Sequence, residues 1–367
     1  MVRQRLTPAA PVTLPGPCAR RVKEVTLSAP TLGALAKFRG RHFLSDQDYT
    51  PEELRELLDL AVALKAVRAR KRVTPYLYGK HLATIFQEPS TRTRVSFENA
   101  MAELGGNMLY LRPGELHLPG RESVGDTAQV LSRYNDAIVG RITHFKVLEE
   151  FAQYASVPVI NGLCSDSSHP VQSMTDVMTV LEHAGRIEGL TMGWLGRANG
   201  MCNSVMLTCT RLGMNVAWAG PEEMSVAPAV VAQAQANCEL SGATLTMSNE
   251  PADGVKDADF IYSDTWWWVQ QEDDQAEMDR RLHINLPYQV NAALMAKAKP
   301  GAKYMHCLPA MRGNEVTDEV IDSPASIVFD EAENRMHFQK ALLIALIGID
   351  ELPSDPDLQE IGRALLT

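Results

Sequence analysis

Residues 81–106, HLATIFQEPSTRTRVSFENAMAELGG, contain the structural unit from which the fold is predicted. The apolar run 81–86 has the length and composition of a buried strand. The run 91–104 has the pattern of a helix, with Ser90 as a favourable N-cap and two glycines after its last turn. A strand joined to a helix by a short polar turn predicts an α/β fold.

Strand and helix patterns alternate along the rest of the chain. Besides 81–86, strands are predicted at 107–111, 136–141, 157–162, 190–196, 215–220, 244–248, 259–264, 303–309 and 326–330. Alternation of this kind predicts parallel sheets covered by helices. Ten strands fit one large sheet or two smaller ones. The long helical pattern that begins near His169 favours two doubly wound α/β domains with parallel sheets, joined by bridging helices.

The predicted domain boundaries follow this alternation. The chain divides into an N-terminal extension (1–41), a first domain (42–168), a bridging helix (169–184), a second domain (185–329) and a C-terminal helix that returns to the first domain (330–367). Ligands of such folds bind at the carboxyl ends of the strands. We therefore look for functional residues directly after the predicted strands.

Composition argues against several classes of protein. The formal net charge of −10 argues against non-specific nucleic-acid binding. No apolar run reaches the roughly 18 residues that a membrane span requires. The six cysteines form no CxxC pair, so neither a disulfide framework nor a structural zinc site is predicted.

The N-terminal extension differs from the rest of the chain. Residues 1–41 hold eight Lys or Arg, five prolines and one acidic residue, Glu24. A cleaved organelle-targeting peptide has this composition, and so does a disordered tail or a stretch translated from an upstream start. We expect a cytoplasmic protein, with an organellar location as the alternative.

The turn after the first strand predicts an anion site. Ser90, Thr91 and Thr93 supply hydroxyl donors at the start of a helix, where backbone N–H groups and the helix dipole favour negative charge. Arg92 and Arg94 are two residues apart and point different ways, so one faces the anion while the other pairs elsewhere. The alternative interpretation is an N-cap with two surface arginines.

Other polar residues follow or end later strands. Arg141 ends the run 136–141, and the alternative for it is an ordinary surface arginine. His169 and Gln172 begin the bridging helix, where a capping role is the alternative. Cys307 follows another strand, and a small buried residue is its alternative. Arg335 lies in an acidic helix start, where salt bridging is the alternative.

Taken in chain order, these motifs resemble those of the aspartate/ornithine carbamoyltransferase family. The order is STRTRVSFE (90–98), an arginine at a strand end, HPVQ (169–172), HCLP (306–309) and ENR (333–335). HCLP is similar to the ornithine-type branch. The stretches 104–123, 288–291 and 305–322 look most like ornithine and putrescine carbamoyltransferases. The resemblance covers about residues 42–350.

The resemblance implies transfer of a carbamoyl group from carbamoyl phosphate to a small amine, with release of phosphate and without any metal or organic cofactor. It makes 42–168 the carbamoyl phosphate-binding domain and 185–329 the acceptor-binding domain. It also implies the residues around carbamoyl phosphate, with Arg92, Arg141, His169, Cys307 and Arg335 as catalytic residues. The implied binding residues are Ser90, Thr91, Arg92, Thr93, Arg141, His169, Gln172, Cys307, Leu308 and Arg335.

The resemblance also implies an assembly. His117 matches a residue that reaches into the site of a neighbouring subunit, so the chain is expected to form a homotrimer or a multiple of trimers. The expected partners are carbamoyl phosphate and the amine, with no nucleic acid and no membrane.

The acceptor-binding stretches depart from the family pattern. Asp264 and Trp266 are kept, but the Ser-Met-Gly run that holds the amino-acid head group in ornithine enzymes is absent. In its place SDTWWWVQQ predicts an aromatic lid that includes Trp266 and Trp268, with core packing as the alternative. Arg197 stands where the family has an acid.

The acceptor is therefore left open between two kinds of amine. Asn199 or Asn203 is expected to supply an amide to it. Loss of Ser-Met-Gly favours a diamine such as putrescine, whereas Arg197 suits an amino acid such as ornithine or a non-standard one.

Two other functions are alternatives to carbamoyl transfer. One is a catalytically silent homologue that acts as a binding or regulatory subunit, which the altered acceptor stretches favour. The other is a nucleotide-dependent dehydrogenase. GWLGRANG is not a GxGxxG fingerprint, however, and no acidic residue follows at the expected distance.

Overall fold

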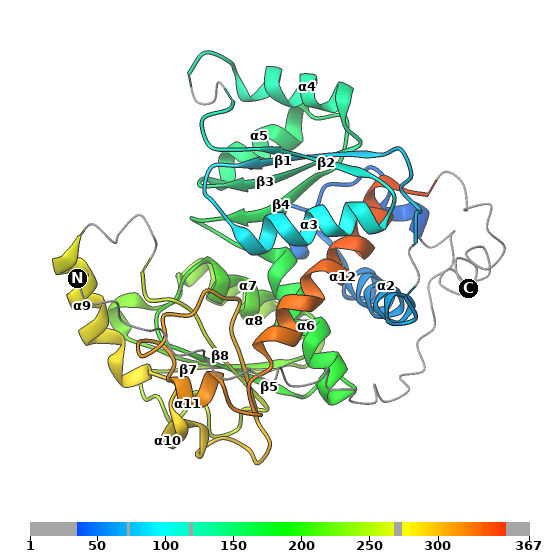
Figure 1. Ribbon diagram of the computed structural model, residues 1–367. Coiled ribbons are helices and arrows are strands. Elements are labelled where there is room, and N and C mark those ends of the chain that lie inside the picture. Colours follow the sequence, from blue (N-terminus) through cyan, green and yellow to red (C-terminus); the bar gives the residue numbers. More distant parts are fainter. Residues whose placement is uncertain (1–34, 72–73, 117–119, 268–273, 350–367) are drawn as a thin grey trace, which may run out of the picture.

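The computed structural model describes residues 35–71, 74–116, 120–267 and 274–349. These residues form two α/β lobes, each built on its own parallel sheet (Figure 1). In the first lobe the strand order is β2 (Asn107–Leu111), β1 (His81–Phe86), β3 (Ala137–Ile142) and β4 (Val159–Cys164). All neighbouring strands of this sheet are parallel.

The second lobe contains a five-stranded parallel sheet. Its order is β7 (Leu245–Ser248), β6 (Asn215–Ala219), β5 (Thr191–Leu195), β8 (Phe260–Ser263) and β9 (Lys303–Met305). In both sheets the chain begins in the middle, moves out to one edge and then returns to build the other side, as in doubly wound folds. The predicted fold class, with two parallel-sheet α/β domains, is confirmed.

Helices cover the sheets of both lobes (Figure 1). They are α2 (Pro51–Ala69), α3 (Thr91–Glu103), α4 (Val124–Tyr134), α5 (Phe145–Tyr154), α6 (Pro170–Ala184), α7 (Gly200–Arg211), α8 (Pro228–Ser241), α9 (Gln275–Asn285), α10 (Ala292–Met295), α11 (Asp318–Ile321) and α12 (Val328–Ile347). Short 3₁₀ turns lie at Ala36–Phe38, Asp46–Asp48, Glu222–Met224 and Leu286–Tyr288. Among the residues that the structure describes, no helix combines the length and the apolar character that a membrane span requires.

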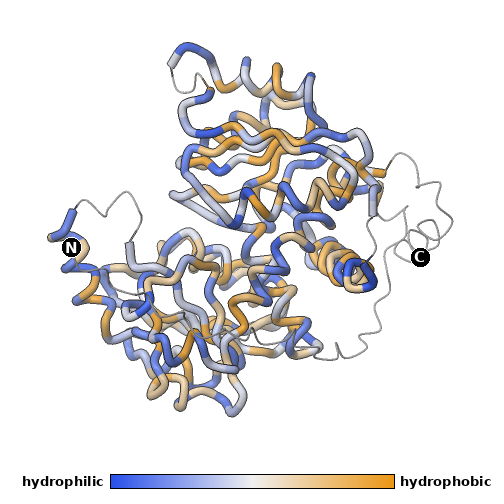
Figure 2. Tube along the Cα trace, in the orientation of Figure 1, coloured by the Kyte–Doolittle hydropathy of each residue, from blue (hydrophilic) through white to orange (hydrophobic). Residues whose placement is uncertain are grey.

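Helices α6 and α12 join the two lobes (Figure 1). Helix α6 follows β4 of the first sheet and precedes β5 of the second, and residues 170–180 are all buried. Helix α12 packs against α2, α3 and α6. The largest apolar cluster includes side chains from both lobes, such as Phe97, Met174 and Trp194. Figure 2 shows hydrophobic stretches along the strands of the first sheet.

The expected strand at 326–330 is wrong. Ser326 forms one isolated bridge with Tyr304, and α12 begins at Val328. Asp330 and Glu331 then fall in the first helical turn, where the helix dipole favours acidic side chains. A short apolar run such as Ile327–Val328 has no period of its own, so sequence pattern alone does not separate strand from helix.

Candidate active site

Arg92, at the N-terminus of α3, is directed at the second lobe. Ser90 caps the helix by accepting a hydrogen bond from the backbone N–H of Thr93 at 3.3 Å. Because the first N–H groups of a helix have no intrahelical acceptor, this end offers donors to an anion. Arg92 is half-buried, and burial lowers the pKa of its guanidinium while Cys307 and Asp264 of the second lobe raise it. Thr91 lies exposed beside it.

Arg94 points away from this site, as the two-residue spacing predicts. Its guanidinium lies 4.2 Å from the centre of the Tyr110 ring and 3.7 Å from Glu98. The side chain is exposed. The two arginines of the motif thus have separate surroundings, and only Arg92 is directed at the second lobe.

Arg141, in β3, is directed into the protein. Its Nε is buried without a hydrogen-bond partner among the described residues. Burial lowers the pKa of its guanidinium, and the neighbouring groups include Glu88, Cys307 and Arg92. The interpretation of Arg141 as an ordinary surface arginine is therefore wrong.

His169 stands at the N-cap of α6, but its side chain makes no capping hydrogen bond. The imidazole is 4% exposed, and its Nδ1 has no partner among the described residues. Burial, followed by the charges of Arg335 and Arg141, holds the pKa of His169 well below its ordinary value. The ring is therefore a neutral, buried group, and a capping role does not explain it.

Arg335, in α12, connects that helix to α3 and α6. It donates to Oε1 of Gln172 and, at 2.8 Å, to Oγ1 of Thr93. Its Nε is buried without a partner among the described residues. Burial lowers the pKa of Arg335 to about 10, and the charges of Arg141 and Arg92 act in the same direction. The alternative interpretation, a salt bridge at an acidic helix start, is not what this arginine makes among the described residues.

Three guanidinium groups therefore share one region. Arg92, Arg141 and Arg335 come from α3, β3 and α12, and the charges of Arg92 and Arg141 act on each other and on Arg335. Arginine stays ionised at neutral pH even when burial lowers its pKa to about 10. Like charges held this close repel one another, so the arrangement is suited to a bound anion of more than one charge.

A second group of polar side chains lies at the carboxyl ends of β5 and β8. Asn199 caps α7 and donates from Nδ2 to Oδ2 of Asp264 at 2.7 Å. The Cys307 thiol lies 3.6 Å from Oδ1 of the same carboxylate. Burial and the charge of Asp264 raise the pKa of Cys307 well above its ordinary value, so the thiol is protonated and donates. Asn203 is not part of this group, because its Nδ2 donates to Ser167 O at 3.1 Å.

Arg197 lies beside Asp264. It is 6% exposed, and its Nε donates to Thr265 O at 3.1 Å. Burial lowers the pKa of Arg197 to about 10, and the charge of Asp264 opposes that change. A guanidinium and a carboxylate therefore occupy the end of the second sheet together.

The tryptophan run is divided by the limits of the described residues. Trp266 is fully buried and Trp267 is 7% exposed. A Cβ added at Gly196 would lie 3.2 Å from Nε1 of Trp266, so this ring packs against the end of β5. Core packing accounts for Trp266. Trp268 lies outside the described residues, as does His117.

The loop after β9 presents Cys307 between two constrained neighbours. Leu308 has φ 57°, in the left-handed region that L-residues rarely adopt. Its N–H donates to Nδ1 of His306 at 2.8 Å, and Nε2 of the same ring lies 3.2 Å from Glu315. Strained backbone of this kind is typical of functional sites.

One set of side chains has a spacing compatible with a metal ion. Asp264, His306 and Cys307 each offer a ligand atom within 4.8 Å of the others. Both ring nitrogens of His306 are already hydrogen-bonded, and the Cys307 thiol is held in its protonated form. A metal requires a free nitrogen and a thiolate, so these residues do not fit one.

Sequence reasoning missed three residues around Gln172 and His169. Ser204 accepts the backbone N–H of His169 at 2.7 Å. Asp176 and Glu331 both accept from the Gln172 side chain. The only local signal for Asp176 is its position one helical turn after Gln172.

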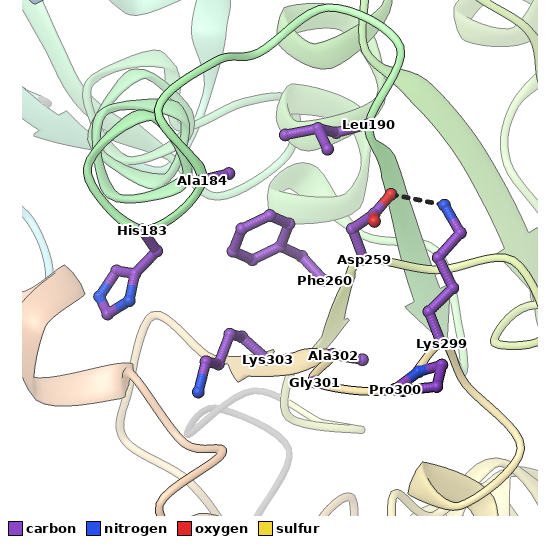
Figure 3. Close-up of a pocket in the computed structure, with 10 residues that line it drawn as sticks. All are labelled: His183, Ala184, Leu190, Asp259, Phe260, Lys299, Pro300, Gly301, Ala302 and Lys303. Atoms are coloured by element: carbon purple, nitrogen blue, oxygen red, sulfur yellow. Dashed lines mark hydrogen bonds and ion pairs between the residues drawn. The ribbon is translucent and has the colours of Figure 1, made fainter. Parts of the chain in front are cut away.

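A separate cavity lies at the opposite, amino-terminal edge of the second sheet (Figure 3). It has a volume of about 160 Å³ and is lined by apolar side chains, including Leu190 and Phe260, with cationic groups around them. Lys299 pairs with Asp259 at 2.8 Å, and His183 pairs with Asp330 at 2.9 Å. None of the predicted site residues lines it.

Comparison with known proteins gives consistent results for both lobes. The family model for the aspartate/ornithine carbamoyltransferase carbamoyl-P binding domain matches residues 41–182, and the model for the Asp/Orn binding domain matches residues 188–346. Ornithine carbamoyltransferase of Pyrococcus abyssi is 49% identical over 314 residues, covering 86% of this chain and 98% of that protein. The corresponding protein of Anoxybacillus flavithermus is 44% identical over 315 residues, covering 86% of this chain and 99% of its own.

Solved structures agree with these relatives. The structure of ornithine carbamoyltransferase from Pyrococcus furiosus aligns with a TM-score of 0.82 at 47% identity, covering 84% of this chain and 98% of that one. The structure of a mitochondrial ornithine carbamoyltransferase from Coccidioides immitis aligns with a TM-score of 0.77 at 34% identity, covering 86% of this chain and 100% of that one.

Proposed function

The chain belongs to the aspartate/ornithine carbamoyltransferase family, and we propose that it transfers the carbamoyl group of carbamoyl phosphate to the side-chain amine of ornithine, releasing phosphate. It is a carbamoyltransferase of the ornithine branch. The silent-homologue and dehydrogenase alternatives are not favoured, because relatives of this identity and coverage are named as enzymes of this one reaction.

One observation carries the proposal for the first substrate. Arg92, Arg141 and Arg335 surround the N-terminus of α3, and Arg141 and Arg335 keep buried N–H groups without partners among the described residues. Carbamoyl phosphate has a doubly charged phosphate and a polar carbonyl, which together can accept these donors. Charge-assisted hydrogen bonds of this kind are the strongest that a protein makes to an anion.

The proposed mechanism needs donors rather than a protein base. When the amine attacks the carbonyl carbon, negative charge develops on the carbonyl oxygen. Thr93, Arg141 and the neutral His169 ring are the donors proposed for that oxygen, and one such donor typically contributes roughly 3 kcal/mol. The C–O bond to phosphate then breaks, and the leaving phosphate accepts the amine proton. Holding the two small reactants together supplies much of the remaining acceleration.

Ornithine is favoured over putrescine by the charges at the end of the second sheet. Asp264 suits an ammonium group, and the neighbouring Arg197 suits a carboxylate. Ornithine carries both groups next to each other, whereas putrescine has no carboxylate. Putrescine was favoured by the loss of Ser-Met-Gly, but residues 268–270, which replace that run, lie outside the described residues.

We also propose the roles of the domains, the assembly and the location of the protein. Residues 42–168 and 185–329 are the proposed carbamoyl phosphate and acceptor domains, with 169–184 as the bridge and 330–367 as the returning helix. The two family-model matches support a division close to these limits. A homotrimer and a cytoplasmic location are proposed as well.

The acceptor is tested by steady-state kinetics with carbamoyl phosphate and a panel of amines. The panel contains ornithine, putrescine, N-acetylornithine, diaminopropionate, lysine and aspartate. We expect kcat/KM for ornithine to exceed that for putrescine at least about 10-fold, since one charge-assisted contact contributes about 1.5–3 kcal/mol, which corresponds to that factor or more. Arg197→Ala should lower kcat/KM for ornithine by a similar factor and leave that for putrescine nearly unchanged.

Two results would contradict the proposal. A higher kcat/KM for putrescine than for ornithine would overturn the acceptor assignment and leave the transferase intact. Absence of carbamoylated product with every amine, in protein shown to be folded, would favour the silent homologue.

A further inference from the structure

Two carboxylates from different helices meet around the side-chain amide of Gln172. Its Nε2 donates to Oδ1 of Asp176 at 2.7 Å and to Oε1 of Glu331 at 3.1 Å. Asp176 is one turn further along α6, and Glu331 is in the first turn of α12. All three side chains are at most 1% exposed. Water therefore does not compensate their charges, and the protein must do so.

The two carboxylates have unequal surroundings. Glu331 accepts from Gln172 and from the Tyr262 hydroxyl at 3.2 Å on Oε1, and from the His306 backbone N–H at 3.0 Å on Oε2. Asp176 accepts from Gln172 on Oδ1, while its Oδ2 is buried with no hydrogen-bond partner among the described residues. Three donors suit an ionised Glu331, whereas an ionised Asp176 would leave charge uncompensated in the interior.

We propose that Asp176 and Glu331 hold one proton between them, carried by Asp176, and that they act as positioning residues for Gln172. Because both hydrogens of the Gln172 amide are directed at carboxylate oxygens, its Oε1 must face the opposite way, toward Arg335. Reversing the amide would place Oε1 against two carboxylates. The inference rests on the proposed function, which puts Gln172 and Arg335 beside the carbamoyl group.

The pair also links the two halves of the site. Glu331 bonds to the backbone of His306, which immediately precedes Cys307, and Gln172 bonds through Arg335 to Thr93. A change in the charge of the pair would therefore reach both the carbamoyl side and the acceptor side. Neither carboxylate touches the reacting atoms in this arrangement.

The proton on the pair makes this device sensitive to pH. Burial raises the pKa of Asp176 to about 7, and burial together with the charge of Asp176 raises the pKa of Glu331 well above its ordinary value, so the two carboxyl groups titrate as a pair. The charged and titratable groups that act on the pair are Arg335, Tyr262, Tyr304, Cys209 and Cys307. The carboxyl group that titrates near 7 is protonated below that pH and ionised above it, so the pair loses one proton as the pH rises through about 7. The negative charge that the pair gains has no further donor to compensate it, because Oδ2 of Asp176 has no partner among the described residues, and it loosens the hold on Gln172.

The first test compares Asp176→Asn with the wild-type enzyme across pH. The amide that this substitution introduces is neutral at every pH, and its Oδ1 still offers an acceptor to Gln172. We expect the ratio of kcat in Asp176→Asn to kcat in wild type to rise at least about 3-fold between roughly pH 6 and pH 8.5, because only the wild type loses the proton. Taking the ratio cancels the titration of the acceptor amine.

For the second variant, Glu331→Gln, we expect a loss of kcat that does not depend on pH. The substitution turns one of the two acceptor atoms into a donor that faces existing donors. We expect kcat to fall at least about 30-fold at every pH in this interval, since a buried donor that meets another donor has lost its hydration without gaining an acceptor. Thr175→Val is the control, because it removes a buried hydroxyl from the same helix as Asp176, bonded to Val171 O at 2.7 Å, without touching the pair.

Infrared spectroscopy gives a readout independent of turnover. The wild type at about pH 6 should show the carbonyl stretch of one more protonated carboxyl group than Asp176→Asn does. A kcat ratio that is flat across pH, an equal loss in both variants, or an unchanged carboxyl band in Asp176→Asn would overturn the proposal. If no amine is carbamoylated at all, the infrared result still shows whether the pair holds a proton.

Discussion

At the scale of single residues, the site depends on charge that the protein leaves uncompensated. Arg335 is 3% exposed, yet its Nε has no partner among the described residues, and the buried Nε of Arg141 is in the same condition. Such groups are costly in the free protein, because a buried donor without an acceptor loses its hydration. A bound dianion would relieve that cost, so the arrangement favours binding.

Replacing Arg92 with alanine should reduce kcat/KM for carbamoyl phosphate at least about 100-fold, because the phosphate loses a charge-assisted contact. Steady-state kinetics at saturating amine measure this. Arg94→Ala is the matched control, since Arg94 lies over the Tyr110 ring and beside Glu98 on the exposed side of α3. Equal losses in the two variants, or near-normal activity of Arg92→Ala, would show that the anion site is wrongly assigned.

At the scale of elements, α12 determines how the lobes are joined. Asn334, in its second turn, is fully buried and accepts from Lys65 of α2 at 2.7 Å. Its Nδ2 donates to Thr179 and Glu182 of α6 at 2.9 and 2.8 Å. One side chain of α12 therefore bonds to both α2 and α6 and holds the three helices together.

Asn334→Ala should lower the free energy of unfolding by about 3 kcal/mol, since it removes the three hydrogen bonds of this buried side chain, each worth roughly 1 kcal/mol. Urea titration followed by circular dichroism measures the change. Phe329→Ala, at a position of the same helix that is 70% exposed, should change stability by less than about 0.5 kcal/mol. A loss in Asn334→Ala no larger than that control would mean that the three-helix contact contributes little.

At the scale of the whole molecule, the site exists only where the two lobes meet. Thr93 belongs to α3 of the first lobe, whereas its partner Arg335 belongs to α12 and is 242 positions away in the chain. Cys307 comes from the end of the second sheet and acts on the pKa values of Arg92 and Arg141. A change that moved one lobe relative to the other would therefore separate the groups proposed to bind carbamoyl phosphate.

The proposed trimer extends this dependence to a neighbouring subunit. Arg92→Ala and His117→Ala should each be inactive, but mixing them under conditions that exchange subunits should restore activity. A site without a lesion needs its own Arg92 and the neighbour's His117, which random mixing of equal amounts provides in about a quarter of sites. Mass measurement confirms the trimer and the exchange. Exchange without recovery would mean that each subunit is complete by itself.

Features that depend on neighbouring residues could be predicted from the sequence. The strands at 81–86 and 107–111 are found as predicted, and Ser90 caps α3 as expected. Apolar runs, capping hydroxyls and helix-ending glycines act within one or two turns of chain, so a short window contains the whole interaction. The same reasoning placed Arg92 at the start of a helix, as the structure has it, and predicted an anion site there.

Features that depend on distant residues were decided by the tertiary structure. Sequence pattern left Arg141 and His169 open between functional and ordinary roles, and packing buried both without partners for Arg141 Nε or His169 Nδ1 among the described residues. It also made Ile327–Val328 the entry to a helix, and it brought Asp176 and Glu331 to the same amide although they belong to different helices far apart in the chain. Burial, pKa and partner choice are set by side chains far apart in the chain, and no local window contains them.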